Sequence, residues 1–263
     1  MRINTNLNAM ISTNQMAKNT ALAGNSMEKL STGLRITKAG DDAAGLAISE
    51  KMRSQIRGME QADRNVQDGV SMVQTAEGAL EEAGNIVQRM RELGVQAGNS
   101  TLEKADRDKI SLELGQLKEE IGKIASDTKF NNTAVFSANT VTIQAGANSE
   151  TRSFKVGTLA TTVSSDVADT AKAKTVVDAA TTDLAKINES RAKLGAVQNR
   201  LEYTSSNLTT STENLSAAES RIRDVDVAKE MVKLSKFNIL TQASQAMVAQ
   251  AKQQPEQVTQ LLR

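Results

Sequence analysis

The residues whose type and spacing come closest to a chemical site are two adjacent carboxylates, Asp41 and Asp42. Such a pair could hold a metal ion or act as an acid and base. The pair directly precedes a helical pattern, however. Carboxylates at the mouth of a helix accept hydrogen bonds from its free N–H groups and are favoured by the helix dipole. We therefore expect Asp41 and Asp42 to form a turn and cap a helix.

The composition removes most other kinds of site. The 263 residues include no His and no Cys, so the commonest metal ligand, the usual acid or base near neutral pH, disulfides and thiolate metal sites are all missing. The glycines do not form a phosphate-binding motif at a strand-to-helix junction. We expect a protein that is not an enzyme, with no catalytic residues, no cofactor and no metal.

Charge and hydropathy limit the partners. The chain has 32 Lys and Arg against 31 Asp and Glu, a balance that argues against nucleic acid or a membrane surface as the main partner. No stretch approaches the roughly 18 apolar residues that span a bilayer. The segment from Met1 to Ala21 lacks the apolar core of a secretory signal peptide. If the protein leaves the cell, we expect it to use another route.

The residues that could pack point to long helices. Aromatic residues make up only 2%, and Pro255 is the single proline. Ala, Val, Ile, Leu and Met suit thin seams between helices better than a thick globular core. The pattern predicts a mainly α fold: a long antiparallel helical coiled-coil rod or hairpin with a small β-hairpin region in the middle.

Two segments carry the seven-residue period of a coiled coil. Large residues alternate with mostly small ones three positions on, so the two segments should pack closely against each other inside one subunit. The large residues of the first, which we expect to be helical from Gly45 to Gly98, are Met52, Met59, Val66, Val73, Leu80 and Val87; those of the second are Ile187, Leu194, Leu201, Leu208, Leu215 and Ile222.

The middle of the chain has a different pattern. A shorter helix that folds back on the first is marked by Ile110, Leu114, Leu117, Ile121 and Ile124. An insert of about residues 137–165 then alternates apolar and polar residues around a Gly-containing turn, which predicts a β-hairpin. Short polar side chains at Ser164–Asp166 predict that helix resumes there. The insert has too little apolar content to fold as a separate domain.

The chain ends carry thin apolar stripes. The helix-prone segments are residues 3–34 and 227–254; a break at Thr37–Asp42 follows the first, and Pro255 should stop the second. Neither stripe could bury enough surface alone, so both need partners. We expect one domain from residues 1–44 with 227–263, and another from residues 45–226. The stripe residues expected to assemble are Ile3, Leu7, Met10, Leu30, Leu34, Leu240 and Met247.

One outward-facing patch stands apart. On helical geometry Val87 and Met90 face the seam, whereas Arg89 and Leu93 point away from it. An outward Leu beside an Arg one turn earlier predicts an amphipathic contact surface. A solvated face with one stray Leu is the equal alternative.

Several long segments, in order at both ends, resemble bacterial flagellins. They include residues 1–6 (MRINTN), 28–36 (EKLSTGLRI), 39–48 (AGDDAAGLAI), 74–80 (QTAEGAL), 192–201 (AKLGAVQNRL), 217–226 (AAESRIRDVD), 242–247 (QASQAM) and the final Leu261-Leu262-Arg263. The resemblance covers nearly all of residues 1–136 and 183–263. Two departures are Phe130-Asn131-Asn132 in place of Phe-Asn-Gly, which Asn tolerates, and the missing outer variable domains.

The resemblance implies a hairpin-shaped subunit whose paired terminal helices line a hollow extracellular filament used for swimming. It implies export without a cleaved signal peptide through the flagellar type III apparatus, with an export chaperone, a filament cap and hook-junction proteins as partners besides self. It also implies contact of a Toll-like receptor with Gln88, Arg89, Leu93 and Glu113, and sensing of Leu261, Leu262 and Arg263, which also belong to the filament core, by cytosolic immune receptors.

The function we expect is therefore a structural subunit that polymerises. One alternative is a hook-filament junction protein, which shares the terminal helices but caps instead of repeating. The other is a secreted binding module or enzyme that uses the central hairpin, which then should fold and act alone.

Overall fold

The structure is a computed structural model that describes residues 6–261, with side chains described through Gln253. Ile3, Leu262 and Arg263 of the expected assembly residues lie outside this range, and Leu261 is described as backbone only. The fold is mainly α, as expected. Its helices are α1 (Leu7–Thr32), α2 (Ala43–Ala97), α3 (Lys104–Asp127), α4 (Thr170–Arg223) and α5 (Val227–Leu261). Within residues 6–261, no helix is both long and apolar enough to cross a membrane.

The chain divides into two compact units. One comprises Met1–Ser54 with Asn214–Arg263, and the other comprises Gln55–Glu213. Both boundaries fall inside helices, α2 and α4, that continue from one unit into the next. The division expected from the sequence, after residues 44 and 226, stays a prediction about the family's domains.

In the unit of residues 55–213, α2 and α4 run antiparallel. Gly94 of α2 lies against Val176 and Val177, and Asp63 accepts a hydrogen bond from the Ser205 hydroxyl. The seam residues of this unit are buried, and Ala62, Ala76 and Ala83 between them are fully buried too, so the two helices approach closely. The buried seam residues are Met59, Val66, Val73, Leu80, Val87, Ile187, Leu194, Leu201 and Leu208, whereas Met52, Leu215 and Ile222 in the other unit are half-buried.

Helix α3 follows a short turn and buries Ile110, Leu114 and Ile121. Two short strands that the sequence analysis did not predict, β1 (Lys129–Phe130) and β2 (Thr133–Ala134), come next and pair antiparallel. Their two-residue turn places Asn131 at φ 46° and Asn132 at φ 64°. Asn is among the few residues that adopt this left-handed conformation readily, so it stands in for the usual Gly.

The predicted central β-hairpin is confirmed. Strands β3 (Val141–Gln144) and β4 (Thr151–Phe154) pair antiparallel with Val141 opposite Phe154 and Ile143 opposite Arg152. Ile143 and Phe154 are buried, and a Cβ at Gly69 of α2 would lie 2.1 Å from the Ile143 Cδ1. The hairpin therefore packs on α2 at a position that leaves no room for a side chain, and it is part of the 55–213 unit.

The connection from β4 to α4 differs from the prediction. Helix α4 begins at Thr170 and not near Ser164–Asp166. The Asp166 carboxylate accepts a hydrogen bond from the Ala168 N–H and so forms a turn outside the helix. The buried Asp183 carboxylate of α4 holds the connection by accepting hydrogen bonds from the Thr161 hydroxyl and from the N–H and hydroxyl of Thr162.

Both expected ends of the terminal helices need correction. Helix α1 ends before Gly33, whose φ of 71° is the left-handed conformation of a helix C-terminus, and not at the break beginning with Thr37. Helix α5 runs past Pro255 to Leu261. A proline leaves the carbonyl four residues earlier without its helical N–H partner. That carbonyl, of Ala251, accepts a hydrogen bond from the Asn6 side chain at 2.6 Å. The polar group that the proline leaves without a helical partner is therefore satisfied.

Gly69→Ala should destabilise the 55–213 unit by about 1–3 kcal/mol, because the added Cβ collides with Ile143 in a closed core. The matched control is Gly78→Ala in the same helix, where nothing lies within 4 Å and the change should stabilise by up to about 1 kcal/mol. Thermal melting of each variant measures this. Gly69→Ala with Ile143→Val, which removes the colliding methyl, should be more stable than Gly69→Ala alone.

Candidate functional site

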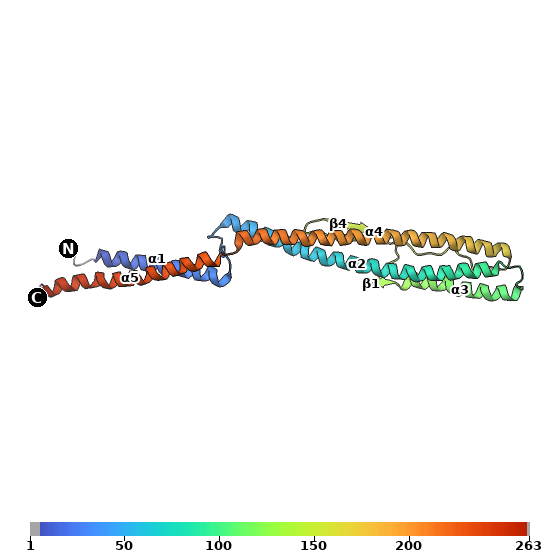
Figure 1. Cartoon of the computed structure of the whole chain (residues 1–263), viewed down its shortest axis with the longest axis horizontal. Coiled ribbons are helices and arrows are strands. Elements are labelled where there is room, and N and C mark those ends of the chain that lie inside the picture. Colours follow the sequence, from blue (N-terminus) through green and yellow to red (C-terminus); the bar gives the residue numbers. More distant parts are fainter. Residues whose placement is uncertain (1–5, 262–263) are drawn as a thin grey trace. The chain divides into compact units, whose positions relative to one another are not determined.

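The terminal helix pair, α1 with α5, lies side by side in Figure 1 and reverses the usual pattern of burial. The buried residues of α1 are Asn19 and Ser26, both polar. On α5 the buried side chains include Glu230. Many of the apolar side chains point outward instead: on α1 these are Leu7, Met10, Ile11, Leu22 and Met27, and on α5 they are Val227, Met231, Val232, Ile239, Leu240 and Met247. Leu30, Leu234 and Phe237 are half-buried, and Ala251 is buried.

Hydrogen bonds join the two helices along their length. The Ser26 hydroxyl donates to Glu230 Oε1 at 2.7 Å, and the Asn19 Nδ2 donates to the Ser244 hydroxyl at 3.3 Å. The third contact is that of Asn6 with the Ala251 carbonyl. Residue numbers on α5 rise as those of their partners on α1 fall, so the two helices are antiparallel, and these polar contacts join them.

The two segments are also joined at the end of the pair where α1 ends and α5 begins. Leu34 and Asp224 form an antiparallel β-bridge, with the Arg35 N–H donating to the Arg223 carbonyl at 2.6 Å and the Val225 N–H donating to the Gly33 carbonyl at 3.0 Å. Asp226 then caps α5 by accepting from the Lys229 N–H, which lowers the pKa of its carboxyl.

Glu230 is the charged centre of the pair. Its carboxylate accepts hydrogen bonds from the Lys233 ammonium at 2.9 Å and from Ser26. These two contacts, led by Lys233, lower the pKa of Glu230 although its burial acts in the opposite direction. The carboxylate is therefore ionised, partnered and fixed in place at neutral pH.

The outer face of α5 is apolar and hollowed. A shallow groove of about 400 Å³ is lined by Met231, Val232, Ser235, Lys236 and Ile239. Val232 and Ile239 are 70% and 65% exposed, more than most apolar side chains of a folded protein. Contiguous apolar surface of this kind marks an interaction site.

The sequence analysis placed the stripe residues on this pair but missed the polar contacts. Leu7, Met10, Leu240 and Met247 are exposed, and Leu30 and Leu34 are half-buried. Ser12, Asn19 and Ser26 recur every seven residues, as do Glu230, Phe237, Ser244 and Ala251. A search for polar as well as apolar heptads would have found the buried side of each helix.

The patch around Arg89 differs in one respect from its prediction. Gln88 and Arg89 are exposed, and Arg89 donates to Glu113 of α3 at 3.0 Å, an interaction that raises the pKa of Arg89. Leu93, expected to point outward, is only 2% exposed. The prediction judged the direction of Leu93 from the seam with the second long helix alone, although the shorter helix was also expected to fold back on the first. Helix α3 packs on a second face of α2, as the Arg89–Glu113 contact shows, and α2 has less solvated surface than a two-helix seam would leave.

The Asp pair caps and turns, as predicted. Asp42 accepts from the Gly45 N–H at 2.8 Å at the start of α2. Asp41 accepts from the N–H groups of Lys38 and Thr37 and from the Thr37 hydroxyl, and these bonds lower its pKa. All three bonds end on Oδ2 of Asp41. Among the residues that the structure describes, no group of three or more His, Cys, Asp and Glu could hold a metal ion.

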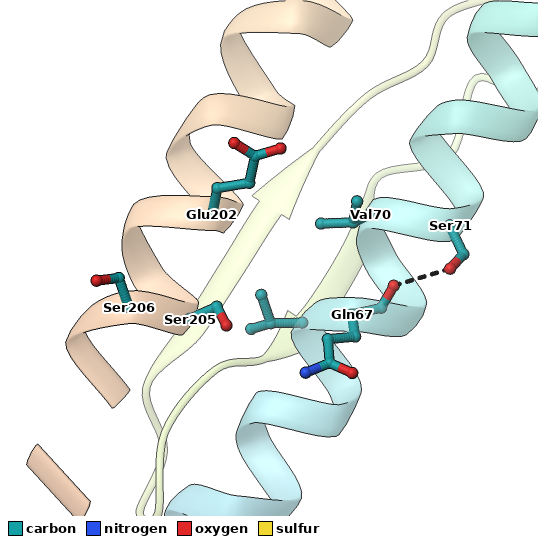
Figure 2. A pocket seen from close by; sticks show the side chains of 7 residues that line it. Gln67, Val70, Ser71, Glu202, Ser205 and Ser206 are labelled. Carbon is teal, nitrogen blue, oxygen red and sulfur yellow. Dashed lines mark hydrogen bonds between the residues drawn. The ribbon is translucent and has the colours of Figure 1, made fainter. Parts of the chain in front are cut away.

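A second groove, of about 460 Å³, lies between α2 and α4. In Figure 2, Gln67, Val70 and Ser71 of α2 lie across from Glu202, Ser205 and Ser206 of α4. Its polar groups have local partners: Ser71 donates to the Gln67 carbonyl, Ser205 to Asp63, and Glu202 accepts from Gln198. The Ser205 hydroxyl and the Asp63 carboxylate thus join α4 to α2 beside the groove.

Comparison with known proteins gives matches to the helical regions at both ends of the chain. A family model described as the bacterial flagellin N-terminal helical region matches residues 3–141, and one for the bacterial flagellin C-terminal helical region matches residues 175–262. The chain is 51% identical to the flagellin of Halalkalibacterium halodurans and 48% identical to that of Bacillus subtilis, in each case over 100% of both chains.

More distant relatives agree. The flagellar filament 33 kDa core protein of Treponema phagedenis is 44% identical over 100% of both chains. Among solved structures, the crystal structure of Bacillus cereus flagellin matches 59% of this chain and 94% of its own, with 34% identity and a TM-score of 0.50.

The polar interface of the terminal helix pair should weaken in acid. The pKa of Glu230 is lowered on folding, so its contribution to stability is present above the usual value of 4.5 and is lost as the pH falls through the folded value. We expect the melting temperature of the wild type to exceed that of Glu230→Gln at pH 7, and the difference to shrink towards pH 3. Circular dichroism measures both; a difference independent of pH would contradict the assignment.

Proposed function

The chain belongs to the bacterial flagellin family and is a structural subunit of the flagellar filament, not an enzyme, and from this premise we propose that its copies join through the outward apolar faces of the terminal helix pair. The observation that carries the proposal is the reversed burial of α1 and α5. Their mutual contact includes Asn19, Ser26 and Glu230, while Ile11, Val232 and Ile239 stay exposed.

The energetics favour neighbours of the same kind. Burying one Ile, Leu or Met side chain contributes about 1.5–3 kcal/mol, whereas one neutral hydrogen bond contributes about 1 kcal/mol net. The exposed apolar side chains of α1 and α5 therefore hold more binding free energy than the polar contacts between the helices. Identical copies in a helical array bring the same faces together at every step, as heterologous contacts do in filaments.

The coiled-coil residues of α2 and α4 serve a different purpose in this proposal. Their apolar seam is buried within one copy, so they supply a stiff outer layer and not an exposed apolar surface for binding other copies. We assign the inner, filament-core role to residues 1–44 with 227–263, including Ile3, Leu261, Leu262 and Arg263 by resemblance, and the outer role to residues 45–226.

The partners beyond self are also proposals. We expect export through the flagellar type III apparatus without a cleaved signal peptide, binding by an export chaperone beforehand, and addition next to cap and hook-junction proteins. What supports this is family membership together with terminal helices that expose their apolar side chains until a partner covers them. The filament that the chain builds lies outside the bacterium.

The rival functions gain no support. A binding module based on the central hairpin requires residues 137–165 to fold alone. The strands β3 and β4 are four residues long each, and their buried side chains Ile143 and Phe154 belong to the 55–213 unit. Two such strands without the helices are marginal in water. Nothing favours a junction protein, and the relatives named above are filament proteins.

Recognition by an animal Toll-like receptor is proposed for the exposed part of the patch. Gln88, Arg89 and Glu113 offer charged and hydrogen-bonding groups on neighbouring helices. Leu93 is only 2% exposed, so we assign it a supporting role and no direct contact with the receptor. Arg is enriched among residues that dominate binding energy. Sensing of Leu261, Leu262 and Arg263 by cytosolic receptors rests on the resemblance alone.

Ile239→Asp should abolish growth of purified chains on fragments of wild-type filament, because it places a charge where a neighbour's apolar surface is expected. Turbidity and electron microscopy measure growth. The control is Asn238→Asp, which adds the same charge at an exposed polar position of the same helix and should leave growth near normal. If Ile239→Asp forms filaments with an unchanged critical concentration, α5 is not part of the assembly surface.

Arg89→Ala should lower the potency of the purified chain in cells that report Toll-like receptor activation by about tenfold or more, the scale of a single anchor residue. Arg91→Ala is the matched control, since it removes an exposed Arg two positions away in the same helix. Circular dichroism verifies that both variants stay folded. Equal potency of the two variants would exclude Arg89 as a contact.

A further inference from the structure

Pro255 creates an unusual feature inside α5. A carbonyl in the middle of an α-helix is normally bonded to the N–H four residues on, and so is unavailable to other groups. Residue 255 is a proline without an N–H, and the helix nevertheless continues to Leu261. The carbonyl of Ala251 is thereby released as an acceptor at one defined height along the helix.

Asn6 uses that acceptor. Its Nδ2 donates to the Ala251 carbonyl at 2.6 Å, and its Oδ1 accepts from the Ala9 N–H at 3.0 Å as the N-cap of α1. One side-chain amide thus satisfies an N–H at the start of α1 and a carbonyl left open in α5. The Asn6 side chain is held at both ends, and Ala251 beside it is buried.

We propose that Asn6 and Pro255 together set the axial register of the terminal helix pair: the proline exposes a single carbonyl in α5, and the cap residue of α1 binds it. The opposite end of the pair is tied by the bridge between Leu34 and Asp224. The arms between these two ties are of nearly equal length on α1 and α5. A slip by one helical turn would therefore break one tie or the other.

The inference deepens the proposed function and rests on it. Register matters because a neighbouring copy contacts the outer faces of both helices together. A shifted α5 would move Val232 and Ile239 along the pair relative to Met10 and Ile11 of α1. The outward apolar surface would then no longer match that of the next copy. Asn6 is accordingly a positioning residue for assembly and is not itself a contact with the neighbour.

The test uses full-length chains growing on fragments of wild-type filament, with the critical concentration as readout. Asn6→Ser and Asn6→Asp both keep a good N-cap, and the Asp charge is favourable at a helix N-terminus. Neither can donate to the Ala251 carbonyl as Asn does, because Ser is too short and Asp is ionised. We expect Asn6→Ser to raise the critical concentration about fivefold, the ratio for about one lost hydrogen bond, and Asn6→Asp to raise it further.

Pro255→Ala provides the decisive background. It restores an N–H at residue 255, so the Ala251 carbonyl regains its own helical partner and no longer depends on Asn6. In that background we expect Asn6→Ser to change the critical concentration less than twofold. Three results overturn the inference: no effect of either Asn6 variant, an equal effect in both backgrounds, or an effect of Asn6→Ser but not Asn6→Asp. Failure of the wild type to grow on fragments would instead refute assembly through these helices.

Discussion

The exposed apolar surface of the terminal helix pair is the constraint on which the rest of the molecule depends. Ordering a residue costs about 1–2 kcal/mol of backbone entropy, and a polar contact such as Ser26 with Glu230 returns only about 1 kcal/mol. The helices α1 and α5 therefore need the burial of exposed apolar side chains such as Leu7 and Val232, which face away from the contact between the two helices. In the assembly that we propose, copies of the chain supply that burial to one another, and the polymer is the state in which the surface is covered.

The remainder of the chain solves the opposite problem. Between residues 55 and 213 the apolar residues lie inside, and small residues such as Ala76 and Gly69 let helices and the β3–β4 hairpin approach within contact distance. This unit buries its apolar seam within one copy and has a closed core. The contrast lies in the direction of the apolar face, because both parts are built from long helices with a seven-residue period.

The sequence sufficed for features that repeat or alternate. The spacing of Val66, Val73 and Leu80 predicted α2, and the alternation around Ile143 predicted the central hairpin. Features that depend on a third element could not be found this way. Leu93 is buried although its helical position looked outward. Helix α5 continues past a proline, and the cap residue of another helix donates to the carbonyl that the proline leaves open. Buried Asn19 and Ser26 look like solvated surface until their spacing is compared with the helix that they face.

The polar character of the α1–α5 contact fits the proposed assembly, which requires apolar surface to stay free for neighbouring copies. Had Ile11 and Ile239 faced each other, the pair would be a stable closed hairpin with little left to bind a neighbour. Hydrogen bonds contribute less free energy but demand specific geometry, so a few of them can fix how two helices align without consuming the apolar area. Buried polar residues that specify register at a cost in stability are known from coiled coils. In this chain Asn19 and Glu230 occupy such positions, and the free energy saved stays available for assembly.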